Sequence, residues 1–383
     1  MAYSSTVLAQ MLKLVPRYEF DVLAREHHHG RKLRRMSRWS QFVAMASGQL
    51  SGRASLRDLI ENLDAQQSRL YHVGLKRVTR SSLARVNERQ PHELFEALFH
   101  KLLARCQRHA PKHGFRFKNK LYSLDASTID LCLKVFPWSH SQQSKGAIKL
   151  HVGLDHGGML PEFVAVTGGK THDLTAGRAL QLPKGSMVAF DKGYIDYQWF
   201  NSLNERSISF VTRLKTNARY DVMDQREVNT NKGLTCDQTI RMTGCKSKLC
   251  TIPLRRIGYQ DPETGKHLVF LTNNFRLAAS TIAKIYKARW QVELFFKWIK
   301  QNLKIKAFLG TSKNAVMTQV WIAMCVYLLL AYIKFTSKTD LSLQQIIRLM
   351  HLNLFHRRPL LELLDPSPPP ISPPSLQQSF MLV

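Results

Sequence analysis

The order of strands and helices between residues 119 and 275 limits the possible folds of this chain more than any other feature. Three strand-like stretches come first, at residues 119–127, 147–155 and 160–169, with a Gly157–Gly158 turn between the last two. Helical and strand-like stretches then alternate, and further strands are expected at residues 187–194, 208–215 and 268–275. This order predicts an α/β core with a mixed sheet, and it best matches the ribonuclease-H-like fold.

Two acidic residues stand at the ends of expected buried strands. Asp125 follows residues 122–124 on the first strand, and Asp191 follows residues 188–190 on a later one. A buried carboxylate is costly without compensation, and two on neighbouring strands would repel each other. A bound Mg²⁺ or Mn²⁺ would remove both problems. For either residue alone, a strand-end cap or a salt-bridge partner is the competing interpretation.

A long helix is expected from Ala278 to about Lys304, and one of its faces is unusual. Four residues on it have offsets of 0, 3, 7 and 14, which places them within an arc of about 60° and along about 20 Å of helix. These residues are Tyr286, Arg289, Glu293 and Lys300. Leu294 and Trp298 are expected to pack from other faces. Glu293 would complete a three-carboxylate metal site, although an amphipathic helix with solvent-facing ion pairs is the alternative.

Residues 1–112 are predicted to form a separate helical and basic domain. A first helix near Ser55 and a second within residues 76–89 suit a helix-turn-helix DNA reader, with Ser81 or Ser82 as the N-cap of the second. A solvated basic helix bundle is the alternative. The basic residues expected to touch DNA are Arg77, Arg80 and Arg85.

The charge balance points to a polyanionic partner. The 56 Lys and Arg residues outnumber the 27 Asp and Glu residues, which gives a formal net charge of +29. Nucleic acid is the first candidate and an anionic membrane surface the second. The most apolar stretch, Val320–Ile333, is too short to span a bilayer comfortably and predicts a buried helix, so we expect a cytoplasmic protein without a membrane partner.

Two further stretches complete the expected organisation. Residues 216–266 are polar with short strand-like pieces, and they predict a β-rich insertion within a catalytic domain that spans residues 113–350. Residues 351–383 form a C-terminal segment with a Pro-rich tail. Three cysteines and a histidine near the insertion have no spacing typical of zinc sites, so reduced thiols are expected. They are Cys236, Cys245, Cys250 and His267.

The helix resembles the signature of bacterial insertion-sequence transposases of family four. That signature is Tyr, two residues, Arg, three residues, Glu, six residues, Lys, and it stands complete here from Tyr286 to Lys300. The segments SLDAST, with Asp125, and AFDKGY, with Asp191, are also similar to boxes of this family. The resemblance covers roughly residues 115–310.

The resemblance implies a DDE transposase that cuts and joins DNA with two Mg²⁺ ions, for which Mn²⁺ can substitute. Asp125, Asp191 and Glu293 would hold the ions. It also implies double-stranded DNA as the partner, with the terminal inverted repeats recognised by the N-terminal helices and a homodimer assembled on DNA. Further DNA contacts are expected from Tyr286, Arg289, Lys300, Lys192 and Tyr194. For His172 and Asp173, at a predicted helix start, a capping role is preferred.

Relatives of this kind use the insertion to hold a DNA hairpin, with a Trp stacked on a flipped base. Residues 216–266 contain no Trp, so Tyr220 or Tyr259 would have to stack instead. Two rival functions remain open. One is a nuclease of the same fold that cuts without joining, and the other is a DNA-binding regulator with a decayed catalytic core.

Overall fold

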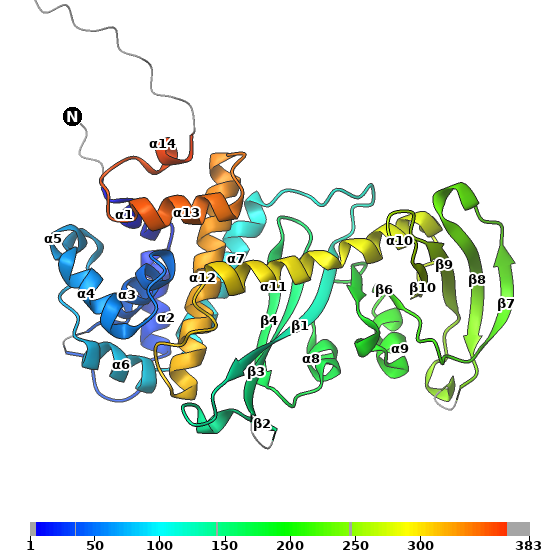
Figure 1. The fold of residues 1–383 in the computed structure, drawn as a ribbon, viewed down its shortest axis with the longest axis horizontal. Coiled ribbons are helices and arrows are strands. Elements are labelled where there is room, and N and C mark those ends of the chain that lie inside the picture. Colours follow the sequence, from blue (N-terminus) through cyan, green and yellow to red (C-terminus); the bar gives the residue numbers. More distant parts are fainter. Residues whose placement is uncertain (1–4, 35, 143–144, 245–246, 366–383) are drawn as a thin grey trace, which may run out of the picture.

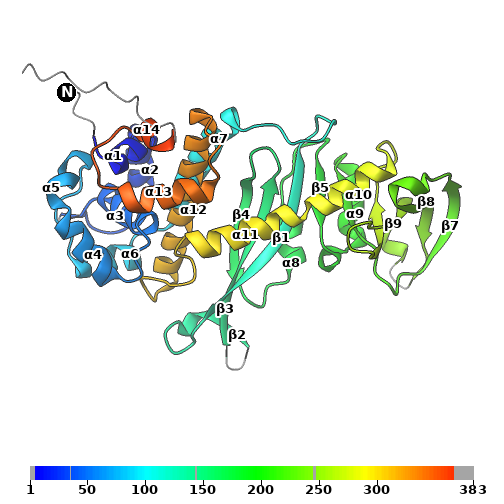
Figure 2. The same ribbon diagram turned by 45° about the horizontal axis from the view of Figure 1, so that its top comes forward.

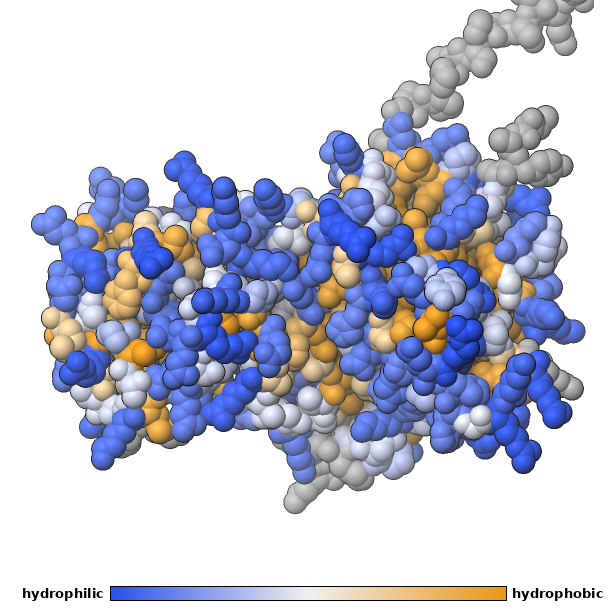
Figure 3. All heavy atoms as spheres, turned by 180° about the vertical axis from the view of Figure 1, so that it is seen from behind, coloured by the Kyte–Doolittle hydropathy of each residue, from blue (hydrophilic) through white to orange (hydrophobic). Residues whose placement is uncertain are grey.

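The computed structural model describes residues 5–34, 36–142, 145–244 and 247–365. Helices from both ends of the chain gather at one end of the molecule, the sheet occupies the centre, and the insertion lies at the opposite end (Figures 1 and 2). Seen from behind, most of the surface is hydrophilic, with hydrophobic patches between the polar side chains (Figure 3). Cys245 and most of the Pro-rich tail lie outside the described residues, so the predictions that involve them are not tested.

The described strands form one ten-stranded mixed sheet, as predicted for an α/β core. Its order is β2-β3-β1-β5-β6-β10-β9-β8-β7, with β4 paired to β3. β1 is parallel to β5 and β5 to β6, whereas the other pairs are antiparallel. The strands are β1 (Leu121–Leu131), β2 (His140–Gln142), β3 (Lys145–Asp155), β4 (Leu160–Gly168), β5 (Met187–Phe190), β6 (Ser209–Arg213), β7 (Tyr220–Arg226), β8 (Leu234–Met242), β9 (Leu254–Gln260) and β10 (His267–Thr272).

The first part of the chain is helical, as expected. Its helices are α1 (Val7–Leu12), α2 (Arg17–Glu26), α3 (Arg38–Leu50), α4 (Leu56–Ala65), α5 (Gln67–Leu70), α6 (Arg80–Arg89) and α7 (Glu93–His109), with the 3-10 turn η1 at Tyr71–Val73. The predicted cap of α6 is wrong. Thr79, rather than Ser81 or Ser82, is the N-cap, because its hydroxyl accepts a hydrogen bond from the backbone N–H of Ser82 at 3.3 Å.

The helix α12 (Lys313–Ser337) forms the centre of the helical body. It packs against α7, α3 and α6, so residues far apart in sequence share one core. It is long and apolar enough to cross a membrane by length and composition, but most of its length is buried inside the protein. The prediction that residues 320–333 form a buried helix is therefore confirmed. The remaining helices of this body are α13 (Leu343–Asn353) and α14 (Leu360–Leu364).

The predicted long helix is divided into α10 (Ala279–Ala288) and α11 (Trp290–Asn302). Arg289 stands between them with helical backbone angles, φ −51° and ψ −32°, so the path of the chain stays nearly straight. Leu294 was expected to pack, but its side chain is 42% exposed. The packing face of α11 consists instead of Val292, Phe295, Phe296 and Ile299, together with the partly buried Trp298.

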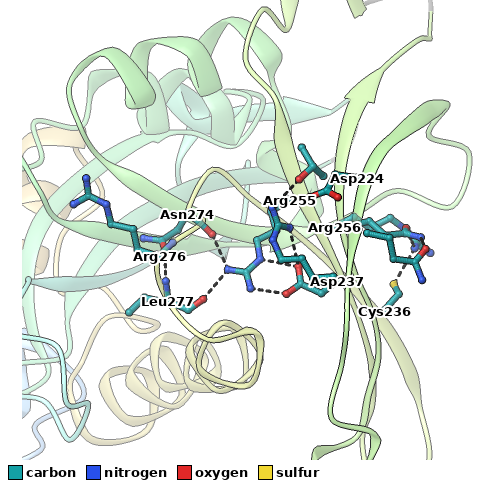
Figure 4. Close-up of polar contacts among 12 residues, drawn as sticks. Asp224, Cys236, Asp237, Arg255, Arg256, Asn274, Arg276 and Leu277 are labelled. Carbon is teal, nitrogen blue, oxygen red and sulfur yellow. Dashed lines mark hydrogen bonds and ion pairs between the residues drawn. The ribbon is translucent and has the colours of Figure 1, made fainter.

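The insertion continues the central sheet and is fixed by a buried ion pair (Figure 4). Arg255 of β9 donates to both carboxylate oxygens of Asp237 on β8, at 2.8 and 2.6 Å. Its remaining guanidinium nitrogen donates to the carbonyls of Asn274 and Leu277, at 3.1 and 2.6 Å. The pair therefore ties the insertion to the loop that leads into α10.

Candidate catalytic site

Asp125 and Asp191 lie next to each other where the parallel pairing of β1 with β5 stops, because the two strands run in the same direction. We call this place the catalytic edge. β1 pairs with β5 from Leu121 opposite Met187 to Leu124 opposite Phe190. Each aspartate is the residue that follows the last pair, so the two lie at the same level of the sheet. β5 ends there, but β1 continues to Leu131, so Asp125 lies within its strand and not at the strand end where it was expected. Asp125 remains paired to β3 and its Oδ1 accepts a hydrogen bond from the N–H of Ala126 at 2.9 Å.

Glu293 reaches this edge on α11, which packs against β1. Arg289 links it to the sheet, because one guanidinium nitrogen donates to Glu293 Oε1 at 2.7 Å and another lies 3.8 Å from Asp125 Oδ2. The hydroxyl of Tyr286 donates to Asp191 Oδ1 at 3.4 Å. The three carboxylates are thus held around Arg289 and Tyr286 rather than in contact with one another.

Burial and mutual repulsion perturb this cluster. Burial raises the pKa of Asp125 to about 6. The Ala126 N–H and Arg289 oppose the rise in this pKa, whereas Glu293 and Asp191 add to it. The pKa of Arg289 is raised even though burial opposes this, since Tyr286, Glu293 and Asp125 favour the charged guanidinium. All three acids therefore belong to one electrostatic neighbourhood.

The acids do not form a ready-made ligand cage. Among the described residues, no group of three His, Cys, Asp or Glu side chains is close enough to hold one metal ion. The guanidinium of Arg289, which contacts both Asp125 and Glu293, supplies positive charge at this place. The three acids provide carboxylate oxygens, which are the donors that a hard divalent ion prefers.

The other residues predicted on the catalytic edge differ in accessibility. Lys192 is exposed, beside Asp191. The ammonium of Lys300 donates to the carbonyl of Thr128 on β1 at 2.8 Å. Direct DNA contact by Tyr194 is not supported, because the residue is only 2% exposed and packs against Phe190. Within the described residues its buried hydroxyl has no hydrogen-bond partner.

The capping role expected of His172 is confirmed. Its Nδ1 accepts a hydrogen bond from the N–H of Leu174 at the start of α8 (Asp173–Ala179). Asp173 forms an ion pair with Lys149, whose Nζ lies 2.9 Å from Asp173 Oδ1. Far from this edge, Arg77, Arg80 and Arg85 are exposed around α6, where Arg77 lies 3.7 Å from Asp64.

Comparison with known proteins shows the family of this chain. The family described as "Transposase DDE domain" matches residues 116–329, more than half of the chain. A putative transposase of Sinorhizobium fredii is 32% identical over 76% of this chain and 81% of its own length. The chain belongs to the DDE transposase family.

Further relatives of this transposase carry insertion-sequence names, which confirms the resemblance to family four. A probable transposase for insertion sequence element IS5377 of Geobacillus stearothermophilus is 29% identical over 70% of this chain and 72% of its own. A putative transposase for IS4SA of Synechocystis is 23% identical over 55% and 59%. Residues 3–76 match a family described as a domain of unknown function. A looser structural match is a piggyBac transposase synaptic complex with hairpin DNA, with TM-score 0.44 and 10% identity over 92% of this chain and 78% of that one.

The transposase has one feature at this edge that the sequence did not single out. A pocket of about 240 Å³ beside Arg289 is lined by Tyr286, Tyr259 and Trp290, among others. Trp290 directly follows Arg289 in the signature helix and is 56% exposed. This position beside Arg289 was the sequence signal that could have pointed to the pocket. Tyr220, the other residue considered for stacking, lies under the guanidinium of Arg256 on the insertion.

Proposed function

We propose that this transposase binds the terminal inverted repeats of an insertion sequence, cleaves DNA at the element ends and joins the released ends to target DNA. The observation that carries the proposal is the gathering of Asp125, Asp191 and Glu293 around Arg289 and Tyr286. Asp125 and Asp191 lie where the parallel pairing of β1 with β5 stops, with β3 antiparallel on the other side of β1, and this arrangement suits a ribonuclease-H-like core.

Two Mg²⁺ ions are the proposed cofactor, with Mn²⁺ as a substitute, and Asp125, Asp191 and Glu293 are the proposed ligands. Their carboxylate oxygens are the donors that these hard ions prefer. Ions held there would stabilise the attacking and leaving oxygens of an in-line displacement at phosphorus. Because Arg289 now contacts both Asp125 and Glu293, its guanidinium must withdraw from them when the ions are bound.

The neighbouring side chains have separate tasks in this proposal. Arg289, once withdrawn, binds a phosphate beside the cut, since a guanidinium matches phosphate oxygens with two hydrogen bonds. Lys300 and the exposed Lys192 hold phosphates on either side. Tyr286 orients Asp191 through its hydroxyl until DNA arrives. The exposed Arg77, Arg80 and Arg85 take part in recognition of the terminal repeats, and two copies of the chain pair the two ends.

Substitution of Asp125 tests the proposal. Asp125→Asn removes a metal ligand with little change in shape, so strand cleavage in Mg²⁺ is expected to be lost while DNA binding in a chelator persists. Asp130→Asn is the matched control, because Asp130 lies on the same strand and is exposed. An Asp125→Asn protein that cleaved as fast as the wild type would refute the assignment.

Pre-cut DNA ends distinguish the transposase from its rivals. The wild type is expected to join such ends to a target plasmid in Mg²⁺ or Mn²⁺. Cleavage of uncut element ends, without any joined product from the pre-cut ends, would support the nuclease instead. Binding without either reaction in both metals would support the decayed regulator.

A further inference from the structure

A large groove on the helical body carries a concentration of positive charge. It has a volume of about 1480 Å³ and lies where α1, α2, α3, η1 and α7 meet. These elements gather at the end of the molecule opposite the insertion (Figures 1 and 2), and none of Asp125, Asp191 and Glu293 lines the groove. The groove is therefore separate from the catalytic acids, and also from the pocket beside Arg289.

The charge on the groove wall is unbalanced. Among the described residues, six cationic side chains line it against a single carboxylate, that of Glu19. The cations are Lys13, Arg17, Lys101, Arg105, Arg108 and Arg357. Across the part of the chain that the structure describes, no carboxylate lies within ion-pair distance of Lys13, Arg108 or Arg357, and all three are exposed.

The remaining cations are held weakly by their own partners. Lys101 is 3.5 Å from Glu19, and Arg17 is 3.0 Å from Asp21, with all four side chains about half exposed. Exposed ion pairs of this kind contribute little to stability, so a polyanion can replace the carboxylates. Arg105 is tied down by its bond to the carbonyl of Leu14 at 2.6 Å.

Aromatic rings stand next to these cations. Tyr71 is 63% exposed at the groove and lies against the ring of His72, with centroids 3.5 Å apart. Deeper in the wall, Trp39 is anchored by its indole N–H to the carbonyl of Val73, and Arg17 lies over its ring at 4.2 Å. Exposed rings among cations are typical of surfaces that bind nucleic acid, where sugars and bases pack on the ring faces.

We propose that this groove binds the sugar–phosphate backbone of DNA at a position separate from the phosphate that is cut. Lys13, Arg108 and Arg357 would contact phosphates, and Tyr71 would contact a sugar or a base. A concave surface of this size suits a strand that enters it better than it suits a flat anionic bilayer. The choice of DNA as the polyanion rests on the proposed function, but the site does not depend on Asp125, Asp191 or Glu293.

The test is DNA binding at several salt concentrations in a chelator, with a duplex and a single strand of mixed sequence as probes. In the triple variant Lys13→Gln, Arg108→Gln, Arg357→Gln, duplex affinity is expected to fall. The dependence of log K on log salt should become shallower by about 2 to 3, since each phosphate contact contributes about 0.9 to the magnitude of this slope. The matched control removes three exposed charges that lie outside the groove and have no ion pair among the described residues: Arg25→Gln, Lys184→Gln, Arg348→Gln. Thermal unfolding checks that both variants are folded.

The outcomes separate this proposal from the proposed function. Equal duplex affinity and salt slope in the triple and control variants would overturn the groove, whatever Asp125→Asn does to cleavage. A loss of binding to vesicles of anionic lipid, with DNA binding unchanged, would overturn it in favour of a membrane. A further loss of affinity in Tyr71→Ala that is confined to the single-stranded probe would support the site and assign the ring to an unpaired base. An equal loss of affinity for the duplex would support the site and assign the ring to the backbone.

Discussion

Two arginines in this transposase, the buried Arg255 in the insertion and the partly buried Arg289 at the catalytic edge, hold carboxylates in opposite ways. Arg255 makes two short bonds to Asp237 and two more to backbone carbonyls, and each of its three nitrogens has a partner (Figure 4). Arg289 divides its guanidinium between Asp125 at 3.8 Å and Glu293 at 2.7 Å, and its buried Nε has no partner within the described part of the chain.

The contrast shows how a protein distinguishes a permanent ion pair from a replaceable one. A buried charge with every hydrogen bond satisfied is expensive to disturb. A partly buried charge that leaves a donor unsatisfied and is shared between two acids can be exchanged for another cation at lower cost. The insertion is therefore fixed to the sheet, while the catalytic edge stays open to rearrangement.

The largest expected effect is on stability, from Arg255→Met. Removing Arg255 leaves the buried Asp237 with only the longer contact to the partly exposed Arg226, at 3.5 Å, and the free energy of unfolding is expected to fall by about 3–5 kcal/mol. Arg289→Met is expected to lose less, because Glu293 and Asp125 remain partly solvated. Urea unfolding of both variants measures the difference, and equal losses would contradict the comparison.

The next effect extends the comparison to His156, a side chain that is buried in its neutral form. Burial lowers the pKa of His156 to about 4, and His113 adds to this shift. Between about pH 6.5 and pH 4 the unfolded chain binds a proton that the folded chain does not, so the free energy of unfolding should fall by about 3 kcal/mol as the pH decreases through this range. His156→Gln, which can still bond to Ser123, should lack this part of the pH dependence; a wild-type slope in the variant would show that another group is responsible.

A smaller effect is expected on metal affinity in the absence of DNA. Arg289→Met removes the cation that competes for Asp125 and Glu293, so Mn²⁺ should bind about tenfold more tightly, which corresponds to about 1.4 kcal/mol. Calorimetric titration measures this, with the exposed Arg276→Met as the control. Weaker binding in Arg289→Met would mean that the guanidinium supports the metal site instead of occupying it.

The smallest effect is expected from Lys300→Ala. Loss of one phosphate contact should weaken DNA binding about fivefold, near 1 kcal/mol, and reduce the salt slope by about 0.9. Lys297→Ala is the matched control, because Lys297 is exposed on the same helix. An identical salt slope in the two variants would remove Lys300 from the DNA-binding surface.

The strands and the acidic residues were predictable because their signals are local. The apolar run before Asp191 ends where β5 ends, and the helical spacing from Tyr286 to Lys300 survives the division into α10 and α11. The cap of α6 was misjudged because Thr79, Ser81 and Ser82 all carry hydroxyls, and only the backbone angles select among them.

Features that depend on distant segments were not predictable. The contacts of Arg289 arise because α11 crosses β1, and nothing in the local sequence fixes that distance. Leu294 is exposed because the partners of α11 select which apolar face is buried. The basic groove combines Lys13, Arg108 and Arg357, which no pattern along the chain connects.

The central position of α12 has a consequence for synthesis. The helices before residue 112 share their core with a helix that ends at Ser337. During translation this hydrophobic surface stays uncovered until α12 has been made and has left the ribosome. The basic surfaces of the first helices therefore reach their final shape only after the segment with Asp125, Asp191 and Glu293 has been made, so a product truncated before α12 would lack a finished helical body.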